Sequence, residues 1–103
     1  MVLDPNLVPK YIGTMKTREA DRLEVERVQT GVRVEKRILK VLKAFAELKD
    51  ITLGDLLEGI VLHAFEGKAP FSSNSLKEID ELRRIYGLKL RAGDSHRLKE
   101  KRA

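Results

Sequence analysis

The chain has 103 residues, 36% of them charged, and its 21 Lys and Arg against 16 Asp and Glu give a formal net charge of +5. This length suits one small domain, and the basic balance favours a polyanionic partner such as nucleic acid. The absence of cysteine excludes disulfides and thiolate sites, and the lack of an apolar run of membrane length predicts a cytoplasmic protein that does not span a membrane.

The first 22 residues predict an N-terminal arm. They contain Pro5, Pro9 and Gly13 and few regularly spaced apolar positions. Such a segment is extended, and it is flexible unless it docks on a partner. Leu23 and Val25 alternate with polar residues but out of phase with the pattern that follows, so they belong either to an irregular strand start or to the arm.

Residues 28–34 alternate apolar and polar side chains, which predicts a β-strand with one covered face. Alternate positions give an apolar face of Val28, Thr30, Val32 and Val34 and a polar face of Gln29, Gly31 and Arg33. A lone strand cannot satisfy its backbone hydrogen bonds or cover its valine face. The expected partner is the same strand of a second copy, so the sequence predicts an obligate homodimer.

Two amphipathic helical patterns follow at once. The first covers residues 35–48, with apolar side chains at helical spacing in Ile38, Leu39, Leu42, Phe45 and Ala46. The second covers residues 53–67, where Thr52 is the predicted N-cap, Asp55 its capping-box partner and Gly67 the stop. The helical residues predicted to join the strand in the dimer core are Leu42, Leu57, Ile60 and Val61.

A strand of about seven residues, a helix of about fourteen, a tight turn and a capped second helix resemble the ribbon-helix-helix family of DNA-binding proteins, the MetJ/Arc/CopG superfamily. The resemblance covers residues 27–65 and implies a mainly α fold. It also implies that the strands of two chains pair into an antiparallel β-ribbon that enters the DNA major groove. Gln29, Gly31 and Arg33 would then contact bases, with Arg33 suited to guanine and Gln29 to adenine.

The start of the second predicted helix is the other expected DNA contact. The amides of Leu53 and Gly54 and the hydroxyl of Thr52 can bind a phosphate, because the first amides of a helix lack partners and its dipole is positive there. Lys36 of the first helix is a further expected phosphate contact. Thr52 also serves as a cap, and both roles can coexist. Because Gly31 has no side chain, a dimeric protein-interaction module with this fold but no specific DNA binding stays open as an alternative.

Beyond residue 67 the sequence predicts a loop, a third helix and a basic tail. Residues 69–74 predict the loop, Ser75 and Glu78 form a capping-box signature that opens the helix, and Gly87 ends it. This helix is additional to the minimal family fold and could cover the core, join two dimers or recruit another protein. Residues 88–103 predict a solvated, poorly ordered tail, with a DNA-backbone contact as the sharper alternative.

The predicted organisation is therefore an arm (1–22), a ribbon-helix-helix domain (23–67), a loop with a third helix (68–87) and a basic tail (88–103). We expect a homodimer that binds double-stranded DNA, can assemble further on it and acts as a transcriptional repressor or autoregulator, including antitoxin-like or plasmid-type regulators. A protein partner on the third helix is also open.

Enzyme chemistry finds no support in the sequence. His63 and His96 belong to no group of residues with metal-ligand spacing. Neither an acid–base carboxylate pair nor a glycine-rich phosphate loop is evident. We therefore expect no enzymatic activity, no metal and no cofactor.

Overall fold

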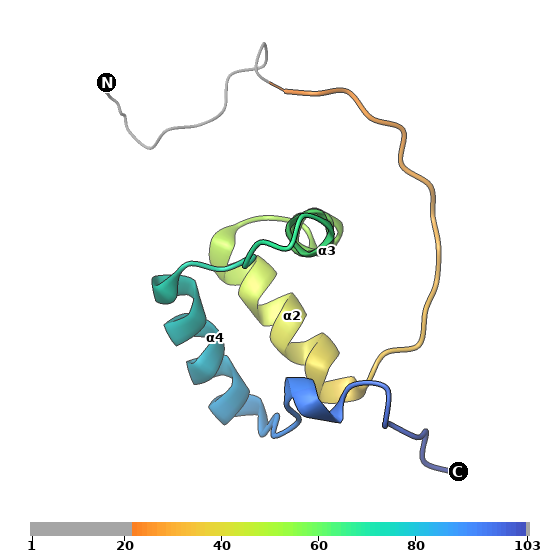
Figure 1. The fold of residues 1–103 in the computed structure, drawn as a ribbon, viewed down its shortest axis with the longest axis vertical. Helices are drawn as coiled ribbons and strands as arrows, with labels where there is room; N and C mark the ends of the chain where they lie inside the picture. The colour runs from red at the N-terminus through yellow and green to blue at the C-terminus, as the bar shows by residue number, and fades with distance from the viewer. Residues whose placement is uncertain (1–21, 103) are drawn as a thin grey trace. The chain divides into compact units, whose positions relative to one another are not determined.

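The computed structural model describes residues 22–102, and this part of the chain is mainly helical, as the sequence predicts (Figure 1). Its helices are α2 (Lys36–Lys49), α3 (Leu53–Phe65), α4 (Ser73–Tyr86) and the short 3-10 helix η2 (Ala92–Asp94). The chain divides after Gly31 into two units, and the helices just named belong to the second. Apart from Arg22, the arm predicted for residues 1–22 lies outside the described residues.

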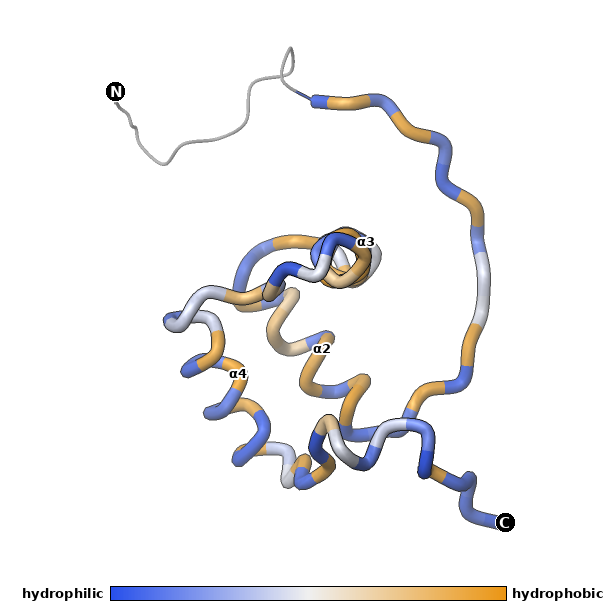
Figure 2. Tube along the Cα trace, in the orientation of Figure 1, coloured by the Kyte–Doolittle hydropathy of each residue, from blue (hydrophilic) through white to orange (hydrophobic). Residues whose placement is uncertain are grey.

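Residues 22–35 have neither helix nor strand in the single chain, although hydrophobic and hydrophilic residues alternate along them (Figure 2). The side chains of Val28 and Val32 are 80% and 78% exposed. The strand predicted over residues 28–34 is thus absent from the described part of the single chain, because a strand forms only when a second strand pairs with it. Its pairing with a second copy stays a prediction.

Helix α2 agrees with its predicted range to within one residue at each end. Its N-cap is Glu35, whose Oε1 accepts hydrogen bonds from the amides of Arg37 and Ile38, each at 2.9 Å. The helix ends at Asp50, which adopts the left-handed conformation with φ 60°. Ile51 then donates its amide to the Ala46 carbonyl at 3.0 Å, so the last turn is closed and the chain can enter α3 after two residues.

Helix α3 confirms the cap at Thr52 and the stop at Gly67, although the helix itself ends two residues before Gly67, at Phe65. The Thr52 Oγ1 accepts a hydrogen bond from the Asp55 amide at 3.0 Å. At the other end Gly67 has φ 70°, a conformation that costs glycine little, and Lys68 donates its amide to the His63 carbonyl at 2.8 Å. These local bonds fix both ends of α3.

The predicted start of α4 is wrong by one turn. The N-cap is Ser72 rather than Ser75, because the Ser72 Oγ accepts a hydrogen bond from the Ser75 amide at 3.1 Å. Residues 73 and 74 of the predicted loop are therefore helical. The predicted stop at Gly87 is confirmed, with φ 69° and its amide bonded to the Arg84 carbonyl at 3.3 Å.

Helix α2 packs against both α3 and α4, so the small core of this unit lies along α2. Phe45, Ala46 and Leu56 are buried at its centre, and the partly buried residues packed against them are Leu42, Ile60, Phe71, Ile79 and Leu82. The rings of Phe45 and Phe71 meet edge to face, with centroids 5.5 Å apart. Helix α4 therefore covers the core, which is one of the three roles that the sequence left open for it.

The prediction of a wholly solvated tail is wrong for the first residues after α4. Leu88 is buried, and the Arg83 guanidinium donates a hydrogen bond to the Leu90 carbonyl at 2.9 Å. The Arg91 amide donates to Asp94 Oδ2 at 2.8 Å, which closes the turn of η2. Burial of Leu88 and the hydrogen bond from Arg83 thus hold this basic segment against α4, while the bond between Arg91 and Asp94 shapes the segment itself. Residues 95–102 are exposed, as predicted.

Candidate nucleic-acid interface

The residues predicted to contact bases are all exposed. Gln29 and Gly31 belong to the first unit and Arg33 to the second. A Cβ added at Gly31 would meet no atom within 4 Å, so the backbone there is open to close approach. A residue must be exposed to contact a base edge. In the single chain the valines beside these residues are exposed as well.

Arg33 forms an ion pair with Glu100 of the tail. Its Nε donates to Glu100 Oε1 at 3.1 Å and its Nη2 to Oε2. The hydrogen bond to this carboxylate raises the pKa of Arg33, which remains protonated throughout the physiological range. The two side chains are 83% and 64% exposed. Ion pairs between exposed side chains contribute little to stability and are screened by salt, so Glu100 can be displaced by a stronger acceptor.

The first turn of α3 is accessible at the residues predicted to bind a phosphate. Thr52 and Gly54 are exposed, and a Cβ on Gly54 would lie 4.0 Å from Thr52 Oγ1, so no bulky group blocks the amides of Leu53 and Gly54. Two features act against an anion here. The Thr52 hydroxyl already accepts a bond from the Asp55 amide, and the Asp55 carboxylate places negative charge in the first turn.

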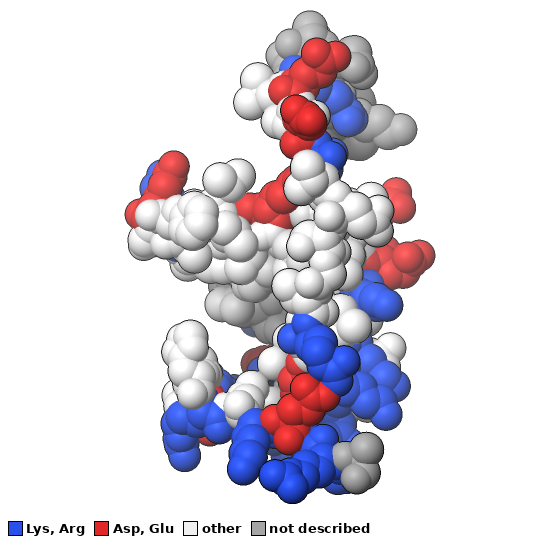
Figure 3. Space-filling model, turned by 90° about the vertical axis from the view of Figure 1, so that its right-hand side faces the viewer, with Lys and Arg blue, Asp and Glu red and all other residues white. Residues whose placement is uncertain are grey.

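Basic side chains gather at the end of the helical unit where α2 begins and α4 ends (Figure 3). A Cβ on Gly87 would lie 3.8 Å from Arg37 Nε, and Lys40 Nζ lies 6.0 Å from the centroid of the Tyr86 ring. With the Arg33–Glu100 pair, these contacts bring residues 33–40 beside residues 86–102. Together these segments carry Arg33, Lys36, Arg37, Lys40, Lys89, Arg91, Arg97, Lys99, Lys101 and Arg102.

Sequence reasoning identified Lys36 and the basic tail separately but did not place them together. They lie close together because α4 packs back along α2, and no local sequence pattern predicts that packing. The acidic residues in the two segments are Glu35, Asp94 and Glu100. Positive charge therefore predominates at this end, which suits contact with a polyanion.

Helix α3 has apolar residues on the face turned away from the core as well. Leu57, Val61 and Phe65 recur every four residues along one side of the helix and are 39%, 42% and 80% exposed. In the single chain, the helical residues predicted for the dimer core therefore fall into two groups. Leu42 and Ile60 pack against the chain's own core, whereas Leu57 and Val61 are exposed.

The remaining predicted dimer-core residues lie before α2. Val28, Thr30, Val32 and Val34 are all exposed in the single chain. A helix whose apolar residues extend beyond the side that faces its own core, like α3, is typical of a buried helix, and an exposed row of valines is costly in water. Both features leave apolar surface uncovered in the single chain.

Residues 22–102 offer neither a metal centre nor a membrane-spanning helix. No group of three or more His, Asp or Glu side chains there could hold a metal ion. Across the same residues, no helix has the length and apolar character needed to cross a bilayer. Comparisons with protein-family models, curated proteins and solved structures find no match to this chain.

Proposed function

We propose that the protein is a homodimer that binds double-stranded DNA, with residues 28–34 of two copies paired as an antiparallel ribbon in the major groove. A protein that occupies a specific DNA site in this way acts as a transcriptional repressor or autoregulator. The observation that carries the proposal is an exposed segment of alternating apolar and polar residues that leads directly into a pair of helices with uncovered apolar side chains.

Dimerisation is supported by the imbalance between the core and the exposed apolar surface. In the described residues the buried hydrophobic side chains are Val41, Phe45, Ala46, Leu56 and Leu88. So small a core is marginal for a domain that folds alone. Pairing of two copies would cover the valines of residues 28–34 and the outer face of α3, and each buried methylene would contribute about 0.8 kcal/mol.

DNA binding is supported by the chemistry of the opposite strand face and by the basic end. Arg33 can donate two hydrogen bonds to guanine O6 and N7, and Gln29 can pair with adenine N6 and N7. Basic side chains near the start of α2, Lys36 among them, would contact phosphates and fix the ribbon in the groove without reading sequence. The ribbon is one of the two elements that the major groove admits.

Selection of bound fragments from random duplex DNA tests the proposal. The full chain is expected to enrich a sequence made of two inverted half-sites, because a two-fold symmetric dimer reads two-fold symmetric DNA. Binding should weaken steeply as salt rises. Recovery of no preferred sequence would contradict the proposal, even if the chain retained weak affinity for all DNA.

A second candidate function is a dimeric protein-interaction module with the same fold. Gly31 favours it, since the middle position of the polar strand face offers no side chain to a base. The exposed Leu76 and Ile85 of α4 favour it as well, because they lie on the helix that covers the core and remain open to a protein partner. A stable dimer that enriches no DNA sequence would make this function the better one.

Replacing Thr52 with Ala separates capping from phosphate contact. Loss of the bond to the Asp55 amide is expected to lower the free energy of unfolding by about 1 kcal/mol in urea denaturation. DNA binding should weaken slightly and equally for all sequences, with no change in salt dependence because the hydroxyl carries no charge. Thr52→Ser keeps the acceptor oxygen and should behave like the unmodified chain. Equal unfolding free energies for the Ala and Ser variants would refute the capping role.

A further inference from the structure

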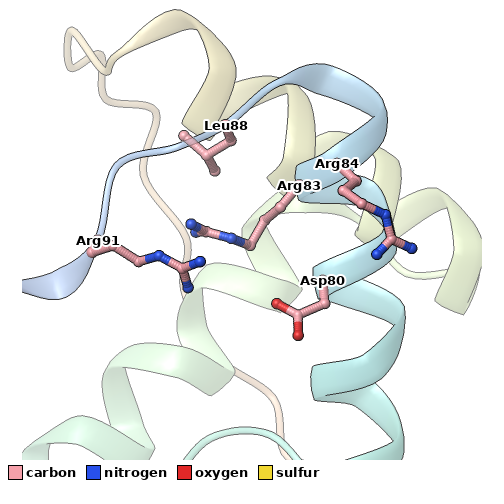
Figure 4. Close-up of a pocket in the computed structure, with 5 residues that line it drawn as sticks. All are labelled: Asp80, Arg83, Arg84, Leu88 and Arg91. Carbon is pink, nitrogen blue, oxygen red and sulfur yellow. The ribbon is translucent and has the colours of Figure 1, made fainter.

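A hollow of about 300 Å³ lies beside the end of α4 and the segment that follows it (Figure 4). The residues that line it are Asp80, Arg83, Arg84, Leu88 and Arg91. It therefore has three guanidinium groups and one carboxylate around a buried leucine. Apart from Leu88 and Arg91, which belong to the basic tail, none of these residues is among the predicted DNA contacts, and no pattern in the sequence predicts that Arg91 lies beside the α4 side chains.

Local hydrogen bonds position the two arginines that come from opposite sides of the hollow. The chain reverses at Gly87, whose φ of 69° favours glycine. The Arg83 guanidinium donates to the Leu90 carbonyl at 2.9 Å, which anchors that side chain and leaves its other N–H groups available. The Arg91 amide donates to Asp94 at 2.8 Å, which fixes the backbone from which the Arg91 side chain extends.

The charges of the hollow are unbalanced. Figure 4 shows the guanidinium groups of Arg83 and Arg91 extending toward each other, while Arg84 points away from them. Arg84 forms an ion pair with Glu81, but among residues 22–102 neither Arg83 nor Arg91 forms one. Two guanidinium groups stay charged at every physiological pH and repel each other, so an anion between them would be stabilised by both.

We propose that this hollow binds a phosphate group between Arg83 and Arg91. Planar guanidinium groups donate paired hydrogen bonds that match the oxygens of phosphate, and two cations suit a group that carries up to two negative charges near pH 7. The carboxylate of Asp80 can accept a hydrogen bond from a hydroxyl next to the phosphate. The volume lies at the lower end of the range for small-molecule sites.

The phosphate can come from a small phosphate ester or from the backbone of a duplex, and the chemistry of the hollow is the same for both. The proposal does not rest on specific DNA binding, because it concerns residues outside the predicted ribbon. Its two experimental arms, one with free phosphate and one with DNA, identify the source.

The first arm titrates the full chain with inorganic phosphate at constant ionic strength and follows backbone amide resonances by NMR. We expect saturable shifts at residues 87–92. Arg91→Ala should weaken binding roughly tenfold or more, since a charge-assisted pair of hydrogen bonds is removed. Arg91→Lys should recover part of the affinity, because it keeps the charge but not the planar pair of donors.

Lys101→Ala is the matched control, because it removes the same charge from an exposed residue outside the hollow. It should change phosphate affinity by less than about twofold, as expected for a screened distant charge. Absence of saturable shifts in the unmodified chain would overturn the proposal. So would equal weakening by the Arg91 and Lys101 variants, since the effect would then be one of net charge alone.

The second arm measures binding to a random-sequence duplex as a function of salt. If the bound phosphate belongs to DNA, Arg91→Ala lowers the salt dependence by about one unit of slope relative to Lys77→Ala, which removes the same charge from an exposed residue outside the hollow and outside the basic end. If it belongs to a small ester, the Arg91→Ala and Lys77→Ala variants bind the duplex equally, while only Arg91→Ala weakens the binding of inorganic phosphate. A chain that binds phosphate but no DNA would refute the proposed function and leave this site standing.

Discussion

Replacing Val32 with Asp is expected to abolish the dimer and, with it, the folded state. In the single chain the Val32 side chain is 78% exposed, and a charge at so exposed a position would ordinarily change stability by less than about 0.5 kcal/mol. In a paired ribbon the same side chain is covered, and an unpartnered buried charge costs on the order of 3 to 5 kcal/mol. Any large effect of this substitution therefore reports on the partner strand.

Circular dichroism measures the folded state of the Val32→Asp variant, and sedimentation measures whether it forms a dimer. We expect loss of the helical signal together with loss of the dimer, because folding of a chain with so small a core is coupled to association. Gln29→Asp introduces the same charge on the opposite strand face and should leave both properties unchanged in the absence of DNA. A soluble, helical monomer of the Val32 variant would rule out the intermolecular ribbon as the basis of folding.

Replacing Arg33 with Ala is expected to weaken binding to the selected DNA site roughly tenfold to hundredfold, and to relax the preference at one base pair in each half-site. Affinity for random duplex should change little by comparison. The reason is that the variant cannot make the two hydrogen bonds to a guanine edge, while most phosphate contacts remain. Competition between specific and random duplex in a fluorescence-anisotropy titration measures both quantities.

Two controls isolate the role of the Arg33 guanidinium. Glu100→Gln removes the ion pair of the single chain but keeps Arg33, so it should not reproduce the weakening. Neutralising Lys99, Lys101 and Arg102 together should weaken binding to every sequence and reduce the salt slope by about one unit for each DNA phosphate that these residues neutralise. Equal weakening on specific and random DNA for Arg33→Ala would show that residues 28–34 do not read the major groove.

If residues 28–34 pair as the proposed ribbon, the tail can influence it through the same ion pair. Glu100 accepts hydrogen bonds from the arginine predicted to contact a base, so the carboxylate and the base edge would compete for one guanidinium. Because the pair is exposed, this competition is weak and decreases further with salt. We therefore expect the Glu100→Gln variant to bind the selected site as tightly as the unmodified chain, or slightly more tightly.

The sequence by itself determined helices α2, α3 and α4 and most of their ends. The Thr52 cap and the stops at Gly67 and Gly87 depend on groups within a few residues along the chain, so their local chemistry could be identified without knowing the fold. Helical periodicity likewise assigned Phe45 and Ala46 to the buried side of α2. The alternation of residues 28–34 predicts a strand, but a strand is a property of two segments, and the partner is not in the single chain.

Only the tertiary structure decided where α4 begins and which residues outside the predicted helices are buried. Residues 72–75 offer several side chains able to cap a helix. Ser72 is the one that caps α4, and Phe71, the residue before it, packs against Phe45. The reach of Glu100 to Arg33 depends on α4 lying along α2, and the burial of Leu88 and the position of Arg91 beside Arg83 depend on how the chain folds back after its reversal at Gly87. Local periodicity and caps report on neighbours within about a turn or two of helix, whereas these contacts join segments that only packing brings together.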